Sequence, residues 1–240
     1  MSVGTTTGTI EERLYSAALG EIPGASRLKL SGRGQLGGGY FPVSPANRAY
    51  PWLAAAELLE VRSTSAQDNP AGTGAYSIRV TGLSAAGAVV VQDITLTGTT
   101  AVPIPLPLFR VNSAEVLGIK SNVGTIVVRR LTPFVGDSLA IIPPTDARMM
   151  GSHYTIPAGR RLWIFATRFS APVATIITRL RWRCPVKGWR VQDLALRTYA
   201  WAQGRTVEIP DVYEAGTDLS WEAQAIGVVT FELAALLTEA

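Results

Sequence analysis

The sequence predicts an all-β protein with two jelly-roll-like β-sandwich domains and an extended N-terminal arm. Short runs of alternating apolar and polar residues recur through most of the chain, as in strands with one buried face. The 23 glycines and 15 prolines separate these runs at turn-like positions. Apolar residues make up 47% of the chain, enough for packed cores. We expect the arm over residues 1–50, the first domain over residues 51–134 and the second over residues 135–240.

The N-terminal arm is predicted because residues 1–50 lack sustained periodicity. Within it, residues 32–37 have the glycine spacing GxGxxG of dinucleotide-binding turns, directly after a possible short strand. In that fold a helix follows the last glycine, whereas here more glycines, Tyr40 and Pro42 follow. We therefore interpret the glycines as part of an arm that lies on a neighbouring subunit.

The clearest local signal in the first domain is a β-hairpin. Two alternating runs, at residues 76–80 and 90–96, are joined by a loop over residues 82–87 that has glycine at both ends. The predicted apolar faces carry Tyr76, Ile78 and Val80 on the first strand, and Val90, Gln92, Ile94 and Leu96 on the second.

The remaining segments of the first domain are less distinct. Residues 52–62 fit a short helix or a strand, and the neighbouring strands favour a strand. The prolines of residues 103–107 exclude a central strand and indicate an edge or a crossover. Two further strands are predicted at residues 109–119 and 125–130, and prolines beyond them place the domain boundary near residue 135.

The second half of the chain predicts about seven strands, consistent with a sandwich or jelly roll. In the strand over residues 162–169, Trp163, Phe165 and Phe169 are expected on one face. The other strands are predicted at residues 154–159, 176–184, 189–196, 205–209, 219–225 and 228–237.

One strand of this half provides a candidate interaction surface. Residues 176–184 place Arg179, Arg181 and Arg183 on one face, opposite Leu180, Trp182 and Cys184. The arginines fit three interpretations: they track phosphates, they guard the strand or bind acids in salt bridges, or they pair with the acidic segment of a neighbouring copy. The surface comprises these arginines and four acids, Asp211, Glu214, Asp218 and Glu222.

The charge distribution is uneven although the net charge is only +4. Ten basic residues and one acid lie from Arg160 to Arg205, whereas seven acids and no base follow. Opposed blocks of this kind face each other across subunits or are solvated, and a chain this near neutral disfavours nucleic acid as a partner. The sequence shows no secretion signal and no apolar run long enough to span a membrane.

The residues that carry common chemistries are sparse. His153 is the single histidine and Cys184 the single cysteine, which excludes an HExxH site, an intramolecular disulfide and a usual structural zinc site. Glu208, Asp211 and Glu214 are close enough in sequence to suggest a carboxylate pair, but a solvated loop is the simpler interpretation. GxSxG, P-loop, EF-hand and CxxC motifs are absent. We expect no catalytic residue, metal or cofactor.

Several short segments carry a resemblance to a known family. They are VRSTSAQDN at residues 61–69, AGTGA at 71–75, IRVTGL at 78–83, TLTGT at 95–99 and FRVN at 109–112. With GEIPG at residues 20–24 and IPAGR at 156–160, this pattern resembles virion structural proteins of tailed bacteriophages. The chain departs from the pattern at Ser84, where an aspartate is usual, and in the proline-rich stretch.

The resemblance implies a non-enzymatic component of the virion, assembled in the host cytoplasm. The role it favours is a capsid decoration or cement protein, in which a homo-oligomer, preferably a trimer, contacts the major capsid protein or other virion proteins. A neck, tail or fibre protein is the alternative. A carbohydrate-binding module is a further one, for which Trp163, Trp189, Trp201 and Trp221 are the candidate sugar-binding residues.

Overall fold

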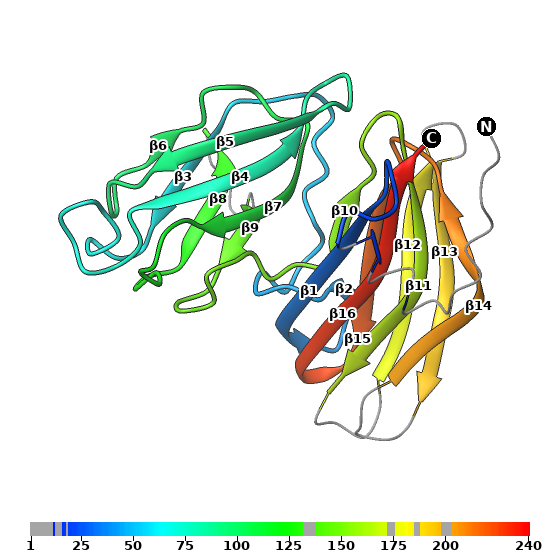
Figure 1. Cartoon of the computed structure of the whole chain (residues 1–240). Helices are drawn as coiled ribbons and strands as arrows, with labels where there is room; N and C mark the ends of the chain where they lie inside the picture. The colour runs from blue at the N-terminus through cyan, green and yellow to red at the C-terminus, as the bar shows by residue number, and fades with distance from the viewer. Residues whose placement is uncertain are drawn as a thin grey trace.

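The computed structural model describes residues 12, 16–17, 19–131, 138–171, 176–184, 188–197 and 203–240. The chain is 55% strand and 2% helix, which confirms the predicted all-β class. In the described ranges no helix is long and apolar enough to cross a membrane. The strands form antiparallel sheets in two groups that lie side by side (Figure 1).

The first group contains two sheets. One has the order β6-β3-β8-β9 and the other the order β5-β4-β7. The strands are β3 (Leu59–Ser63), β4 (Ser77–Leu83), β5 (Val89–Thr95), β6 (Val102–Pro103), β7 (Arg110–Val116), β8 (Ile126–Arg130) and β9 (Ser138–Ile142). Both sheets contribute to one cluster of buried side chains, drawn from residues 50–149, that we call the first core.

The predicted hairpin is confirmed as β4 and β5. Ile78 lies opposite Ile94, and the side chains of Ile78, Val80 and Ile94 are buried in the first core. Tyr76 differs from the prediction, because it precedes the strand and is 40% exposed. The buried Gln92 amide accepts from the backbone N–H of Leu106 at 2.8 Å and donates to its carbonyl at 3.3 Å. The Gln92 side chain therefore supplies the hydrogen bonds that fix the proline-rich crossover, because prolines cannot donate to a strand ladder.

The first core extends beyond the boundary expected near residue 135. β9 pairs with β8, and Leu139, Ala140 and Ile142 are buried in the first core. The boundary expected near residue 135 therefore falls between two neighbouring strands of one sheet. Upstream, the strand expected at residues 52–62 is confirmed only for its second half, as β3.

The second group also contains two sheets. One has the order β1-β16-β11-β14; the other has the order β10-β15-β12-β13, with β2 paired to β15. The strands are β1 (Ser26–Gly37), β2 (Phe41–Pro42), β10 (His153–Thr155), β11 (Arg160–Ser170), β12 (Ile176–Cys184), β13 (Gly188–Arg197), β14 (Gln203–Tyr213), β15 (Asp218–Gln224) and β16 (Ile226–Glu239). Their shared buried side chains, drawn from residues 30–43 and 154–237, form the second core.

The second core is organised around Trp221, which has 0% exposure and packs against Phe231 with ring centroids 5.4 Å apart. Counted by sheets, the molecule has a four-blade, propeller-like arrangement. The buried side chains of the four sheets fall into the two cores described above.

Strand β1 lies in the segment that was expected to be an extended arm. It pairs with β16 along its whole length, so residues 26–37 belong to a sheet of this chain. A Cβ on Gly32 would lie 2.2 Å from the carbonyl oxygen of Val43, and a Cβ on Gly34 would lie 2.2 Å from that of Ser44. The glycines are needed because the backbone of residues 43–44 crosses directly over the strand. This packing accounts for the first two glycines of the GxGxxG spacing without a nucleotide.

The predicted face of β11 is wrong because the strand contains a β-bulge. Its register shifts between Ile164 and Ala166 against both neighbouring strands. Trp163 and Phe165 lie on the outer side of the sheet, whereas Phe169 is buried in the second core. One extra residue reverses the alternation beyond it.

The close crossing over β1 can be tested by alanine substitution. We expect Gly32→Ala and Gly34→Ala each to lower the free energy of unfolding by about 1–3 kcal/mol, because the added methyl overlaps a backbone carbonyl. Gly37→Ala is the matched control, because its Cβ would lie 3.7 Å from the nearest atom, the Asn47 amide nitrogen. Urea unfolding of the three variants measures the difference; equal stabilities would contradict the crossing.

Candidate functional site

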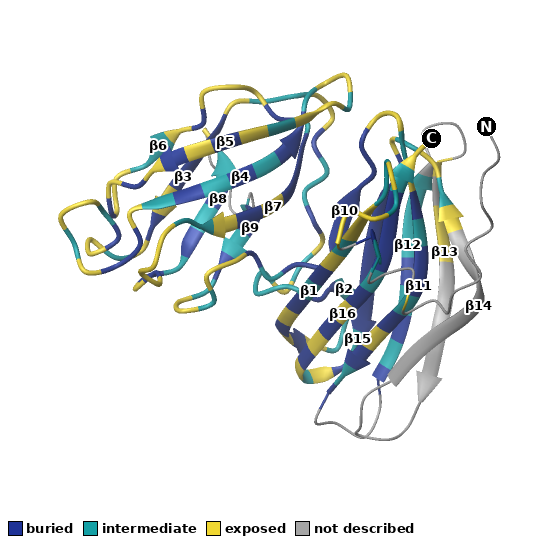
Figure 2. Cartoon of the chain, viewed as in Figure 1, coloured by how far each residue is buried: buried dark blue, intermediate teal, exposed yellow. Residues whose placement is uncertain are grey.

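The two groups of strands meet at a buried polar junction. On β15 the residues that face away from the second core are also buried, with Asp218, Ser220 and Glu222 exposed by only 2%, 1% and 3% (Figure 2). Buried polar groups need partners, and here they come from both groups of strands. We call the following residues the junction: Tyr50, Arg110, Asn112, His153, Thr155 and Asp218.

An ion pair between Arg110 of β7 and Asp218 of β15 lies at the centre of the junction. The Nε and Nη2 atoms of Arg110 donate to the two carboxylate oxygens of Asp218 at 2.8 and 2.9 Å, and both side chains are 2% exposed. The remaining nitrogen, Nη1, donates to the carbonyls of Leu53 at 2.8 Å and Phe109 at 2.7 Å. The Phe109 ring centroid lies 3.7 Å from the guanidinium carbon. The buried cation is therefore fully partnered.

Asp218 is stabilised as a carboxylate by several donors. Burial by itself would raise its pKa, but hydrogen bonds from Arg110, Thr155 and Arg183, with the Arg110 charge, outweigh burial and hold the pKa below its usual value. The Thr155 hydroxyl donates at 2.6 Å and Arg183 Nε at 3.1 Å. Asp218 therefore connects a strand of the first group to two strands of the second.

A second set of hydrogen bonds runs parallel to the ion pair. The amide of Asn112 donates to the carbonyl of Thr155 at 2.8 Å and accepts from its backbone N–H at 3.0 Å. The Asn112 side chain therefore bonds the backbone of β10 as a neighbouring strand would, on the edge that does not pair with β15. Nearby, the Ser152 hydroxyl accepts from the backbone N–H of Val43 at 2.7 Å and donates to the carbonyl of Trp221.

His153 and Tyr50 form the apolar side of the junction. Their ring centroids lie 3.8 Å apart, and both side chains are buried. Burial lowers the pKa of His153 to about 4, although the backbone near Val111 and the Asp218 charge favour the protonated form. Burial also raises the pKa of Tyr50 above its usual value. Among the described residues His153 Nε2 has no hydrogen-bond partner. Both rings are therefore neutral near pH 7.

The predicted arginine row on β12 is adjacent to the acids of β15. Arg179 is in register with Glu222 and contacts it at 2.6 Å, and Arg181 lies 3.8 Å from the same carboxylate. Arg183 is in register with Asp218 and pairs with it. Of the three interpretations, this geometry favours salt bridges to acids, and the acids belong to the same chain.

The other two acids of the candidate interaction surface lie elsewhere. Glu214 pairs with Arg161 at 2.9 Å, and both side chains are largely exposed. Asp211 lies on β14, but its side chain is outside the described part of the structure. The predicted surface is therefore divided: Arg183 reaches Asp218 at the junction, Glu222 binds the other two arginines further along β15, and Glu214 lies apart on an exposed face.

Sequence reasoning included Asp218 but missed its partner in the junction, Arg110, together with Asn112. Arg110 and Asn112 alternate with Val111, which is buried in the first core, so their side chains face the other group. The signal available in the sequence was the pair of polar residues at alternate positions of a predicted strand, next to apolar neighbours. The partner could not be found, because Asp218 is 108 residues away in the chain.

The described side chains also bear on metal binding and on the sugar binding that the sequence left as an alternative. Among the described residues no three His, Cys, Asp or Glu side chains are close enough together to hold a metal ion. Of the tryptophans proposed for sugar binding, Trp221 is fully buried and Trp163 donates its Nε1–H to the Thr238 hydroxyl at 3.1 Å. The side chains of Trp189 and Trp201 lie outside the described part, as does that of Cys184.

Comparison with known proteins gives no further assignment. No protein-family model matches the sequence, and no curated protein matches it significantly.

Replacing Arg110 tests the role of the buried ion pair. We expect Arg110→Met to lower the free energy of unfolding by about 3–5 kcal/mol, because it leaves a buried carboxylate with fewer donors. Arg79→Met is the control, because Arg79 forms the same two-pronged contact with Asp93 on an exposed surface. We expect that variant to unfold like the original chain. Urea unfolding distinguishes the two, and a similar loss in both would contradict the central role of the junction.

His153 predicts a specific dependence of stability on pH. Its pKa is about 4 in the folded chain and about 6.5 in the unfolded chain, so its contribution is complete above pH 6.5 and is lost as the pH falls to about 4. The loss over this window amounts to about 3 kcal/mol. Asp218, with its lowered pKa, adds a loss only below about pH 4.

Unfolding measured across this range should show the loss in the original chain and a flatter profile in His153→Gln. Equal profiles would mean that the imidazole is not held neutral at the junction.

Proposed function

We propose that the protein is a non-enzymatic structural component of a tailed-bacteriophage virion, most specifically a decoration or cement protein of the head. The observation that carries this proposal is the run of segments at residues 61–99 that resembles such proteins. The proposal extends to a homo-oligomer, preferably a trimer, that contacts the major capsid protein.

The resembling segments build a loop around a buried carboxylate. Asp68 has 0% exposure and accepts backbone N–H groups from Ala75 at 3.0 Å, Val123 at 2.8 Å and Gly124 at 2.9 Å. A Cβ on Gly74 would lie 2.1 Å from the Asp68 carboxylate. The aspartate and the AGTGA turn are therefore parts of one structural unit. A likeness in these residues supports a shared architecture and a mechanical role.

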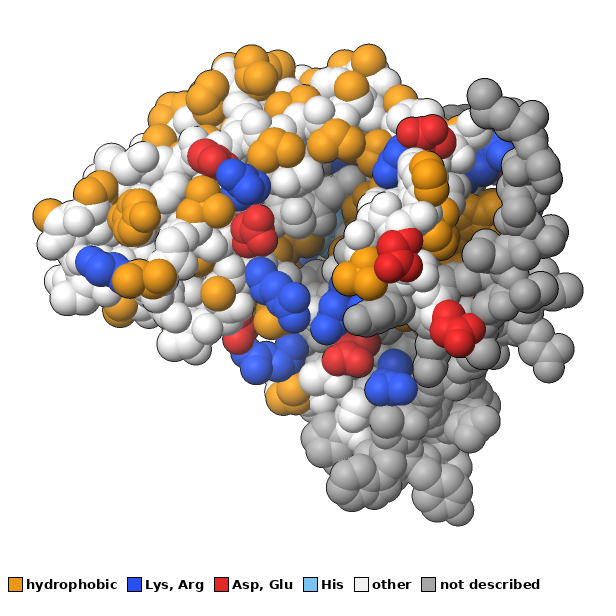
Figure 3. Space-filling model, in the orientation of Figure 1, with side chains coloured by type: hydrophobic (Ala, Val, Ile, Leu, Met, Phe, Trp, Pro, Cys, Tyr) orange, Lys and Arg blue, Asp and Glu red, His pale blue; other side chains and the backbone are white. Residues whose placement is uncertain are grey.

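The proposed architecture is two jelly-roll-like β-sandwich domains held in one orientation by the junction. The two cores, each lying between two sheets, support it. Such a body suits a protein that stabilises a shell by its surfaces. Val89, Val91 and Leu106 of the first group are each 54% exposed, and apolar side chains are frequent on the face drawn in Figure 3. Apolar surface of this kind stabilises contacts with neighbouring copies or with the shell.

A position in the neck, tail or fibre is the second candidate, supported by the same resemblance. The two positions differ in symmetry and therefore in copy number. A shell protein is present in on the order of hundreds of copies, whereas a neck or tail ring has about six or twelve.

Electron microscopy of purified particles, with quantitative mass spectrometry of the protein, tests the proposal. We expect density on the head surface and a high copy number. Density confined to the neck or tail would overturn the decoration role, and absence from purified particles would overturn the virion assignment altogether.

A further inference from the structure

A large cleft lies between the two groups of strands. It has a volume of about 720 Å³ and is lined on one side by residues 27–31 of β1 and on the other by residues 112–115 of β7. Tyr154 and Val89 are among its apolar lining residues. This volume is in the range of binding pockets. Figure 3 shows Lys and Arg side chains gathered where the two groups meet on this face.

The β1 side of the cleft is an open sheet edge. β1 is the outermost strand of its sheet. The Ser31 carbonyl accepts from the backbone N–H of Gly151 at 3.0 Å, which shows that Ser31 directs its backbone groups away from β16. Backbone direction alternates along an antiparallel strand, so Arg27 and Lys29 direct theirs to the same side. In the described part of the chain, no backbone hydrogen bond engages either residue there.

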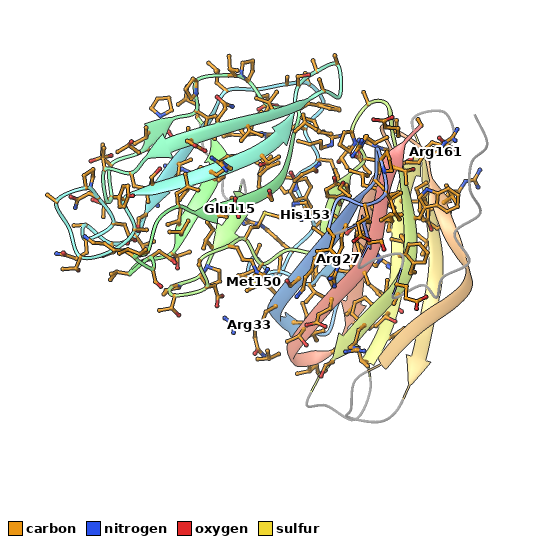
Figure 4. The ribbon with its side chains drawn as sticks, in the orientation of Figure 1. Arg27, Arg33, Glu115, Met150, His153 and Arg161 are labelled. Atoms are coloured by element: carbon orange, nitrogen blue, oxygen red, sulfur yellow. The ribbon has the colours of Figure 1, made fainter. Side chains whose placement is uncertain are left out.

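The side chains along this edge are cationic. Arg27 and Lys29 are exposed, and Arg148 lines the cleft with them. Within the described ranges none of the three forms an ion pair, whereas Arg33, further along β1, pairs with Asp146 at 2.8 Å. Glu115 of β7 is the one acid among the lining residues (Figure 4). The cleft therefore carries an excess of uncompensated positive charge.

We infer that this cleft binds an extended acidic segment of a partner chain, which adds to β1 as a further strand. The backbone of the segment pairs with the open edge at Arg27 and Lys29. Carboxylates at alternate positions of the segment lie beside the Arg27 and Lys29 side chains, as opposite charges do on neighbouring strands. Residues 27–31 span about 13 Å, which fits a segment of about five residues.

Two features favour a peptide over other anions. An open strand edge offers alternating N–H and C=O groups, which the backbone of another peptide matches and a nucleic acid does not. The charged side chains occupy the face next to this edge, so backbone pairing and charge pairing act on the same segment. The inference does not depend on a position in a virion.

The competing explanation is that the cations only protect the edge. Lysine and arginine on outer strands prevent pairing with other chains. In that case removal of the charges would favour self-association and would not weaken binding of an acidic peptide. The two explanations therefore predict opposite results for one variant.

The test uses the full chain and a labelled peptide of about seven residues in which glutamate alternates with valine. We expect binding in a fluorescence anisotropy titration, and slower amide exchange at residues 27–31 in the complex. Arg27→Gln combined with Lys29→Gln should weaken the affinity about tenfold or more. Gln35→Glu is the control; it lowers the charge of β1 by one unit, where the double variant lowers it by two, but Gln35 lies outside the lining residues. We expect it to bind as the original chain does.

Further probe peptides separate charge from backbone pairing. Two versions of the same sequence carry N-methyl groups on one or the other alternate set of amides. The version methylated on the amides that face β1 should bind at least about tenfold more weakly, because it loses its donors to the edge, whereas the other version keeps them. A peptide with lysine in place of glutamate should not bind. Failure of the acidic peptide to bind, equal affinity of the double variant, or self-association of that variant without peptide binding would each overturn the inference. Tighter binding of single-stranded DNA than of the peptide at the same residues would also overturn it.

Discussion

The arrangement of the two groups of strands depends on the buried ion pair between Arg110 and Asp218. Removing both charges from water is costly, and their attraction compensates only if every other donor and acceptor is satisfied. This requirement explains why the carbonyls of Leu53 and Phe109 and the Thr155 hydroxyl converge on the pair. A purely apolar contact would allow β7 and β15 to shift relative to each other. These directional hydrogen bonds are satisfied together only when the two strands keep one relative position.

The parts of the fold that local patterns determine could be predicted from the sequence. The hairpin β4–β5 and strand β12 have period-two alternation, and the structure confirms both. Only the first part of strand β1 was expected, as a possible short strand before the glycines, because glycine occupies two of its inward positions, where an apolar side chain would mark a strand. Glycine is required at these two positions because the backbone of residues 43–44 crosses over them. Similarly, the face of Phe169 depends on a bulge in β11, which leaves no mark in the alternation.

In the candidate site, too, only the features that follow from local alternation could be predicted from the sequence. Alternation placed Arg179, Arg181 and Arg183 on one face, and the structure supports that grouping. Their acidic partners were in the predicted set, but the pairing follows from the strand order β15-β12, which no local pattern encodes. Arg110 lies outside the prediction altogether, because its strand belongs to the other group. Residue types therefore identify charged faces, whereas topology decides whether such a face is a surface or a junction.

The junction and the cleft share strand β7, and this links the two parts of the molecule. Arg110 and Asn112 of β7 hold the second group, while Glu115 of the same strand lines the cleft opposite β1. The strand is continuous between these positions. The ion pair and the Asn112–Thr155 bonds therefore help to hold the two walls of the cleft in place, together with the Arg33–Asp146 pair. A segment bound in the cleft would contact both groups and reinforce the orientation that the ion pair establishes.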